Sequence, residues 1–186
     1  MHPIKYLWGL RALIYKPFFG KIGSNSYIGK PCFLEGIQNI YIGNRVRIFP
    51  GARIQTLDDG VIEIGDNTAI EQNVHITSAK TKLEIGNNVT ILGNTFITNL
   101  DHNYQDISKS VLEQGISSKI TKIGDGCFIG FGSAIQAGTV LGKHCIIGAS
   151  SVVRGIFPDY VVIVGNPGRI IKQYNPQTCE WERIKN

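Results

Sequence analysis

An aliphatic residue recurs at every sixth position along most of this chain of 186 residues. Wherever the next six-residue unit follows without an insertion, the position four residues further on is Ser, Thr, Cys, Ala or Val. An α-helix repeats at about 3.6 residues and a strand at two, so neither explains a period of six. A coil with three flat sides does explain it, because each side is a short strand and each corner is a turn that favours glycine. The aliphatic positions form six runs of three: 22, 28, 34; 42, 48, 54; 64, 70, 76; 85, 91, 97; 123, 129, 135; and 141, 147, 153.

Three hexapeptides make one coil, so the six runs predict a prism of six coils stacked as parallel strands about 4.8 Å apart. The repeat is interrupted only after the third hexapeptide of a run, which places every insertion at the same corner of the prism. One insertion is long and spans residues 101–120. Long excursions from a rigid scaffold are usually functional, so this loop is the first place to look for a site.

The chain divides into three parts: an apolar segment at 1–21, the repeat at 22–155 and a closing segment at 156–186. The first part is predicted to contain a helix that ends near Pro17. In the closing segment, residues 161–175 predict a strand, a Gly-Asn-Pro turn and a return segment, and residues 179–186 predict a short helix.

Charge is uneven along the chain, since residues 1–34 hold five basic side chains and no acidic one. The remaining residues carry 14 basic and 14 acidic side chains, which does not indicate a nucleic-acid partner. Residues 1–20 are too short to span a bilayer and lack a cleavage site for secretion. Two alternatives remain for them: packing on this domain or a neighbouring subunit, or peripheral contact with an anionic membrane.

The cysteines indicate a core role and a reducing compartment. Cys32, Cys127 and Cys145 occupy the small inward position of the repeat, so we expect them in the core. Cys179 stands apart, and the chain has no CxxC pair. This usage predicts a cytoplasmic protein without disulfides, with the inner face of the cytoplasmic membrane as its place if residues 1–20 bind lipid.

His102 is the candidate catalytic residue because it opens the long insertion beside Asp101. Imidazole is the side chain that most often serves as a base near neutral pH. Asp106 and Glu113 lie further along the insertion, and either is a candidate to orient the ring. His75 and His144 fall at outward positions of the repeat and are expected to be solvated. The chain has no GxSxG nucleophile motif and no phosphate-binding glycine loop between a strand and a helix.

The segments IGNNVTILGNTFITNLDH (85–102), IGDGCFIGFGSAIQAGTVLGKHCIIGASSVVRG (123–155) and VGNPGRIIK (164–172) resemble the hexapeptide-repeat acyltransferases. Within that family they are most similar to the galactoside, maltose and exopolysaccharide O-acetyltransferases. The resemblance implies an all-β fold, a left-handed parallel β-helix, although parallel crossovers are otherwise nearly always right-handed. It also implies a homotrimer with active sites between subunits, acetyl-CoA as acyl donor and no metal.

The same resemblance implies roles for individual residues. His102 becomes the general base, and Asn73, His75 and Asp101 become acceptor contacts. The cofactor contacts carried over by motif position are Phe131, Ala149, Arg154 and Arg169. The sequence departs from the family at Phe128, where a Trp is common, and in its apolar, basic start.

The sequence therefore predicts a CoA-dependent O-acetyltransferase acting on a sugar hydroxyl in bacterial surface polysaccharide biosynthesis, on a free or lipid-linked acceptor. An N-acetyltransferase that acts on an amino-sugar nucleotide is the nearest alternative. A zinc hydratase of the γ-carbonic anhydrase type shares this helix, but it needs three converging His ligands, and the spacing of His75, His102 and His144 does not match. A purely structural or binding β-helix would not need the long insertion with its histidine.

Overall fold

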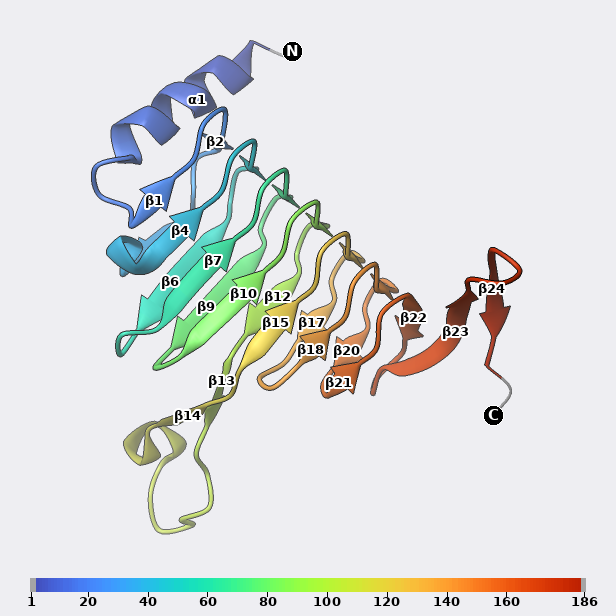
Figure 1. Ribbon diagram of the computed structural model, residues 1–186. Coiled ribbons are helices and arrows are strands. Elements are labelled where there is room, and N and C mark those ends of the chain that lie inside the picture. Colours follow the sequence, from blue (N-terminus) through green and yellow to red (C-terminus); the bar gives the residue numbers. More distant parts are fainter. Residues whose placement is uncertain (1–2, 185–186) are drawn as a thin grey trace.

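The computed structural model describes residues 3–184 and shows a prism of stacked coils whose strands form three parallel sheets (Figure 1). Each coil passes through sheet A, then sheet B, then sheet C, and each strand pairs with its equivalent in the next coil. We name the corners of the prism after the sheets they join: A/B, B/C and C/A. Six complete coils are present, as the repeat predicts.

The strands are short, and those of sheet C include the longest in the prism. Sheet A consists of β1 (Lys21–Ile22), β4 (Ile40–Ile42), β7 (Val61–Ile64), β10 (Lys82–Ile85), β15 (Thr121–Ile123), β18 (Val140–Leu141) and β21 (Ile156–Phe157). The parallel part of sheet B consists of β2 (Tyr27–Ile28), β5 (Arg47–Ile48), β8 (Ala69–Ile70), β11 (Thr90–Ile91), β16 (Phe128–Ile129), β19 (Ile146–Ile147) and β22 (Val161–Val164). Sheet C consists of β3 (Phe33–Glu35), β6 (Arg53–Leu57), β9 (His75–Ala79), β12 (Phe96–Thr98), β17 (Ala134–Ile135) and β20 (Val152–Val153).

The core is the interior of the prism, and the repeat positions fill it. Seventeen of the eighteen aliphatic positions are buried, and only Leu34 in the first coil is partly exposed. The small positions sit beside them near the corners, where several hydroxyls bond to main-chain carbonyls of the next coil. Thr68 Oγ1 donates to the Gly86 carbonyl at 2.9 Å, and Ser133 Oγ donates to the Gly148 carbonyl at 3.1 Å. Burial and hydrogen bonding at these two kinds of position explain the period of six.

The cysteines follow the prediction at two of the three repeat positions. Cys127 and Cys145 are buried, and their thiols donate to the carbonyls of Gly142 and Pro158. Cys32 is exposed, so the expectation that it lies in the core is wrong. It belongs to the first coil, where no preceding coil covers this corner. Cys179 is also exposed.

Thiol labelling of the native protein should therefore divide the four cysteines into two pairs. We expect Cys32 and Cys179 to react quickly with an aromatic disulfide reagent and Cys127 and Cys145 to react only after unfolding. The neighbouring Cys145 thiol and burial raise the pKa of Cys127, which keeps it protonated near neutral pH. Cys127→Ser should keep activity, because Ser fills the same position at 133 and 151. Fast labelling of a third thiol in the folded protein would contradict this assignment.

Every insertion leaves the prism at the C/A corner, as predicted. The first contains a 3₁₀ turn, η1 (Ile37–Asn39), and the long one forms an antiparallel hairpin of β13 (Leu100–His102) and β14 (Ile116–Ser118). A 3₁₀ turn, η2 (Val111–Gln114), lies within the hairpin loop. Figure 1 shows this hairpin projecting away from the prism.

Past Val153, the structure confirms the strand, turn and return segment predicted for residues 161–175 and departs from the prediction elsewhere. β21 and β22 add to sheets A and B as a partial seventh coil. Phe157 pairs with Leu141 and Ile163 with Ile147, so the spacing of six holds within this coil after a step of only four residues from Val153. A turn containing the cis Asn166–Pro167 bond leads into β23 (Arg169–Asn175), which pairs antiparallel with β22. The last described element is a strand, β24 (Glu180–Arg183), so the helix predicted for residues 179–186 is wrong over 179–184, and its last two positions lie outside the described residues. Trp181 explains the difference, because its ring packs against Tyr174 of β23 across the hairpin.

A single helix, α1 (Ile4–Tyr15), covers the N-terminal end of the prism (Figure 1). It ends just before Pro17, as expected. Trp8 and Ala12 are buried, and the Trp8 ring contacts Tyr27 and Phe49 of the first two coils at centroid distances of 5.7 and 5.6 Å. Arg11 Nη1 donates to the Ile28 carbonyl at 3.1 Å. Within residues 3–184, no helix is long and apolar enough to cross a membrane.

Candidate active site

The base of the long hairpin is fixed by a buried asparagine that the sequence analysis did not single out. Asn99 is fully buried, and its Oδ1 accepts a hydrogen bond from the Ala79 main-chain N–H at 2.8 Å. Its amide nitrogen donates to Ser78 Oγ at 3.0 Å and Thr81 Oγ1 at 3.1 Å. An asparagine directly before an insertion is the only sequence signal for this role. These bonds hold the point at which the hairpin leaves sheet C.

His102 lies in β13, at the C/A edge of the prism, and its side chain is exposed. The main chain pairs His102 with Ile116 of β14, so the position of the residue does not depend on the ring. Within residues 3–184, the His102 ring makes no hydrogen bond to another side chain. The imidazole is therefore positioned by the hairpin and open to a ligand.

Asp101 faces two cations rather than His102. Its Oδ2 lies 2.5 Å from Arg154 Nη2 and 3.7 Å from Lys119 Nζ. Arg154 follows β20, two coils beyond β12, and Lys119 follows β14, so the three charges join the hairpin to the C/A corner. Such a partly exposed ion pair contributes about 0–1 kcal/mol to stability, so its main effect is to orient the hairpin base. Sequence reasoning did not identify Lys119, because its position depends on how the insertion returns.

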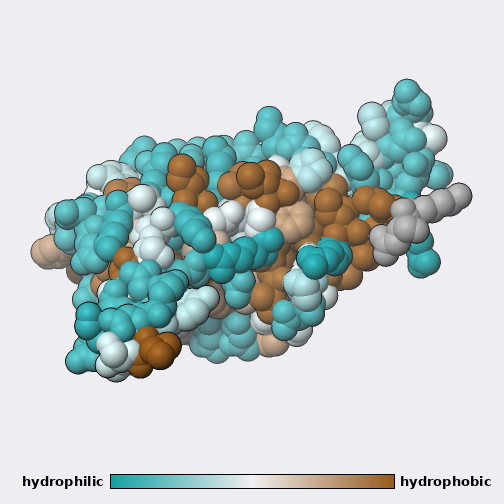
Figure 2. All heavy atoms as spheres, turned by 90° about the horizontal axis from the view of Figure 1, so that it is seen from below, coloured by the Kyte–Doolittle hydropathy of each residue, from teal (hydrophilic) through white to brown (hydrophobic). Residues whose placement is uncertain are grey.

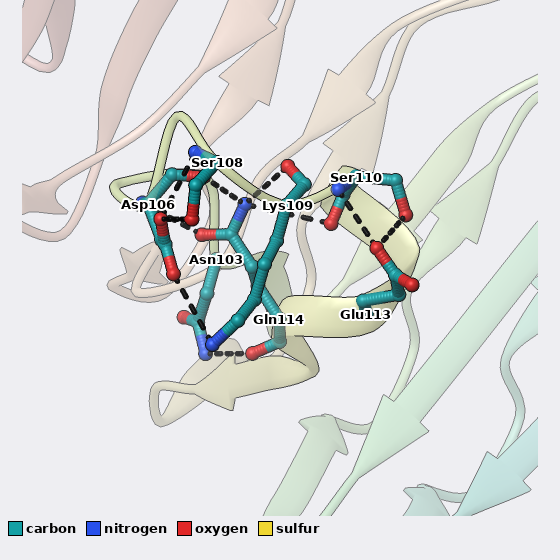
Figure 3. Close-up of polar contacts among 7 residues, drawn as sticks. All are labelled: Asn103, Asp106, Ser108, Lys109, Ser110, Glu113 and Gln114. Atoms are coloured by element: carbon teal, nitrogen blue, oxygen red, sulfur yellow. Dashed lines mark hydrogen bonds and ion pairs between the residues drawn. The ribbon is translucent and has the colours of Figure 1, made fainter.

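The other two acids of the insertion do not orient His102, which corrects that expectation. Asp106 Oδ1 accepts from Ser108 Oγ at 2.6 Å, and its other oxygen lies 3.2 Å from Lys109 Nζ (Figure 3). Glu113 Oε2 accepts from both the main-chain N–H and the hydroxyl of Ser110. These serine hydrogen bonds hold the pKa values of Asp106 and Glu113 below their usual range. Both carboxylates stabilise the fold of the loop itself.

The outer face of sheet C carries a column of side chains across successive coils. Register places Phe33, Arg53, His75, Phe96, Ala134 and Val152 side by side. The His75 ring meets the Phe96 ring edge-on at 5.1 Å, and its Nε2 lies 2.9 Å from Thr77 Oγ1. Burial, followed by the charge of Arg53, lowers the pKa of His75, so the ring is neutral near pH 7. His75 is thus half-buried rather than freely solvated, on a face that mixes aromatic and polar groups.

Asn73, Phe131 and Ala149 occupy the B/C corner, at the opposite edge of sheet C from His102. Phe131 and Ala149 are exposed in successive coils, and the Phe131 carbonyl accepts from the Ser150 N–H at 2.8 Å. A Cβ atom added at Gly130 would lie 2.5 Å from the Ala149 nitrogen, so glycine allows these two corners to stack. Asn73 has a left-handed backbone, and its side chain lies over Gly51. One chain therefore does not bring His102 to the residues of this corner.

Arg169 lies at the C-terminal end of the prism, in the first position of β23. It borders an apolar groove of about 610 Å³ together with Phe157, Gly168, Ile170 and Ile184. Figure 2 shows hydrophobic side chains gathered toward this end of the molecule, whereas the projecting hairpin is mostly hydrophilic. Arg154, its partner in the expected cofactor set, is held by Asp101 at the C/A corner, so the structure does not join the two arginines in one cluster.

A larger groove of about 690 Å³ runs along sheet A and the A/B corner, and none of the predicted site residues lines it. Asn and Asp side chains of successive coils accept main-chain N–H bonds there, as Asp66 does from Asn44 at 2.8 Å and Asp125 does from Asn87 at 2.7 Å. Lys82 and Lys122 pair with Glu84 beside them. These polar groups form hydrogen bonds and ion pairs with one another, so their role is to hold successive coils together. No cluster of three or more metal-ligating side chains occurs within residues 3–184.

Known proteins resemble this chain in sequence over most of its length. A family model described as bacterial transferase hexapeptide (six repeats) matches residues 120–155. WbbJ of Escherichia coli K12, provisionally named a lipopolysaccharide biosynthesis O-acetyl transferase, is 32% identical over 162 residues, which cover 82% of this chain and 81% of WbbJ. Galactoside O-acetyltransferase of the same strain is 26% identical over 165 residues, covering 89% of this chain and 69% of the enzyme.

A solved structure extends the likeness to the fold. AntD, an N-acyltransferase from Bacillus cereus, in complex with dTDP-4-amino-4,6-dideoxyglucose and coenzyme A, superposes with a TM-score of 0.77. The match covers 90% of each chain at 21% sequence identity. The expected all-β architecture, a left-handed parallel β-helix of six coils with one N-terminal helix, is confirmed. The chain belongs to the bacterial hexapeptide-repeat transferase family.

Proposed function

We propose that this protein is a CoA-dependent O-acetyltransferase that modifies a sugar hydroxyl in bacterial surface polysaccharide biosynthesis. The observation that carries the proposal is the hairpin, which holds an exposed imidazole at the edge of the mixed polar and aromatic face of sheet C. The similarity to WbbJ over four-fifths of both chains supports the substrate class.

His102 is the general base in this proposal. It takes the proton of the acceptor hydroxyl as that oxygen attacks the thioester carbonyl of acetyl-CoA, and the CoA thiolate then leaves. Main-chain N–H groups hold the oxyanion that develops on the carbonyl. The transfer is direct, because Cys127 and Cys145 are buried and the two exposed cysteines lie outside the coils that carry His102, Phe131 and Ala149. Cys32 belongs to the first coil, and Cys179 lies between β23 and β24.

The active site of the proposed enzyme lies between two copies of the chain in a homotrimer. His102 at the C/A edge of one prism faces Phe131 and Ala149 at the B/C edge of its neighbour, where the pantetheine arm of acetyl-CoA lies. Phe131 and Ala149 suit that role because they are exposed and belong to stacked corners with accessible main chain. Asn73 of the B/C corner and His75 of sheet C contact the acceptor, and the pair of Asp101 and Arg154 positions the hairpin.

Arg169 contacts a phosphate of CoA in this arrangement. Arg169→Ala is expected to raise KM for acetyl-CoA about ten- to hundredfold with little change in kcat, because a charged hydrogen bond far from the thioester contributes roughly 1.5–3 kcal/mol to both bound states. Steady-state kinetics at a saturating acceptor measure this, with Arg183→Ala of β24 as the matched control. An unchanged KM in Arg169→Ala would remove Arg169 from the site.

An N-acyltransferase acting on an amino-sugar nucleotide is the second candidate, and the structural match to AntD favours it. Radiolabelled acetyl transfer to a panel of hydroxyl sugars, nucleotide amino sugars and lipid-linked sugars separates the two. O-linked product that is released by mild base supports the first proposal. Base-stable product formed only on amino sugars replaces it with the second.

A further inference from the structure

Helix α1 is apolar on two opposite faces. The inner face, with Trp8 and Ala12, packs against the first two coils. The outer face is formed by Tyr6, Leu7, Leu10, Leu13 and Ile14, which fall within an arc of about 120° at 100° per residue. Polar side chains do not collect on a face of their own, because Lys5 and Arg11 lie on the two flanks between the apolar faces.

The outer face is open to solvent. Its five side chains are between 55% and 67% exposed, and Phe18, just beyond the helix, extends the surface with 62% exposure. Soluble proteins rarely expose so many large apolar groups together unless the surface binds something. We call these six residues the outer patch.

The segment of the chain that carries the outer patch is basic, since residues 1–34 contain five basic side chains and no acidic one. Lys5, Arg11, Lys16, Lys21 and Lys30 are the charged residues of positions 1–34. Lys16, Lys21 and Lys30 are exposed. Lys5 lies over the Tyr27 and Phe49 rings, and Arg11 bonds to the Ile28 carbonyl, which fixes both at the flanks of the helix.

We infer that α1 attaches this protein to an anionic lipid surface, with the outer patch in the headgroup–acyl boundary and the lysines at the lipid phosphates. A helix with an apolar face bordered by cations lies in this plane, and each basic residue adds attraction to an anionic leaflet. The position of α1 at the end of the prism lets the patch reach a flat surface without the prism blocking it (Figure 1).

Charge argues against a second copy of the same patch as the occupant. Two patches packed face to face would bring the basic side chains of residues 1–34 in one copy toward those in the other, and this segment contains no acidic side chain to pair with them. An anionic bilayer satisfies both the apolar surface and its cationic border.

Vesicle flotation of the purified full-length protein tests the inference. We expect the protein to float with vesicles of phosphatidylcholine and phosphatidylglycerol at 3:1, and at least tenfold less with phosphatidylcholine alone. Leu10→Gln/Leu13→Gln should lower the partition coefficient at least tenfold, and Lys16→Gln/Lys21→Gln should lower it severalfold. Ile156→Gln is the matched control, since Ile156 is 82% exposed at the other end of the prism and should leave flotation unchanged.

Light scattering measures the mass of the oligomer that each variant forms, so that a change in flotation can be separated from a change in assembly. A mass equal to that of the wild type, with flotation lost in the helix variants, supports lipid attachment. Three results would overturn the inference. The wild-type protein does not float, it floats as well with neutral vesicles as with anionic ones, or the variant Leu10→Gln/Leu13→Gln floats as well as the wild type. A smaller oligomer in that variant, together with no flotation of the wild type, would make the outer patch a subunit interface. None of these readouts requires the proposed acetyl transfer.

Discussion

Replacement of His102 by alanine is expected to lower kcat by about 10²- to 10⁴-fold, while the Kd for CoA stays the same. The loss is expected because His102, in the proposed mechanism, is the base that accepts the hydroxyl proton. Folding should be unaffected, because β13 pairs with β14 through its main chain and the exposed ring has no hydrogen-bonded side-chain partner within residues 3–184. Steady-state assays at a saturating acceptor concentration measure kcat, and isothermal titration calorimetry measures the Kd for CoA.

His144→Ala is the matched control for that experiment. His144 lies at the A/B corner and stacks on the Tyr160 ring at 5.6 Å, so its removal changes a surface contact alone. We expect its kcat to equal that of the wild type. If His102→Ala keeps more than about a third of wild-type turnover, His102 is not the general base, because a general base contributes at least about 10²-fold to kcat.

Asn99→Ala should have the largest effect on stability among polar substitutions near the site. It would leave the Ala79 N–H without its partner in a buried position and remove the bonds to Ser78 and Thr81. Each buried group left unsatisfied costs about 1–3 kcal/mol, so chemical unfolding should show a loss of at least that size. Turnover should also fall, because the hairpin base that carries His102 is no longer fixed.

Asn103→Ala provides the comparison, since Asn103 Nδ2 donates to the Gln114 carbonyl at 3.1 Å inside the projecting loop. Loss of this partly buried bond should cost less than about 1 kcal/mol. Equal unfolding free energies for Asn99→Ala and Asn103→Ala would show that the Asn99 contacts do not hold the hairpin base.

Much of the fold can be predicted from the sequence because one period determines both core and corners. The aliphatic position fixes which side of each strand faces inward, and the interruptions of the repeat locate the C/A corner. The prediction fails where a segment has a neighbouring coil on one side only: Cys32 in the first coil is exposed, and residues 180–183 form β24 rather than a helix. β21 and β22 continue the stack because Phe157 and Ile163 keep the spacing of six, after a step of only four residues from Val153 to Phe157.

The candidate site was less predictable than the fold. The position of His102 at the base of the insertion follows from the break in the repeat. The partners of the acidic side chains could not be predicted in this way, because the ion pair of Asp101 with Arg154 joins residues 53 positions apart across stacked coils. Asp106 and Glu113 bind serines two and three residues away in the sequence, which the spacing permits but does not require.

In the proposed enzyme, two copies of the chain share each active site. Within one prism, His102 and Ala149 lie on opposite edges of sheet C, so neither edge alone holds both the base and the proposed pantetheine contact. Two variants separate the halves: His102→Ala removes the base, and Ala149→Trp fills the corner where the pantetheine arm would lie. Each alone should be inactive.

Co-expression of these two variants with different affinity tags, followed by purification on both tags, gives trimers that contain both chains. In a cyclic trimer of either mixed composition, one of the three interfaces pairs an intact His102 with an intact Ala149 corner, so we expect about a third of wild-type activity. Activity no higher than that of the separate variants, in mixed trimers of verified mass, would contradict a shared site.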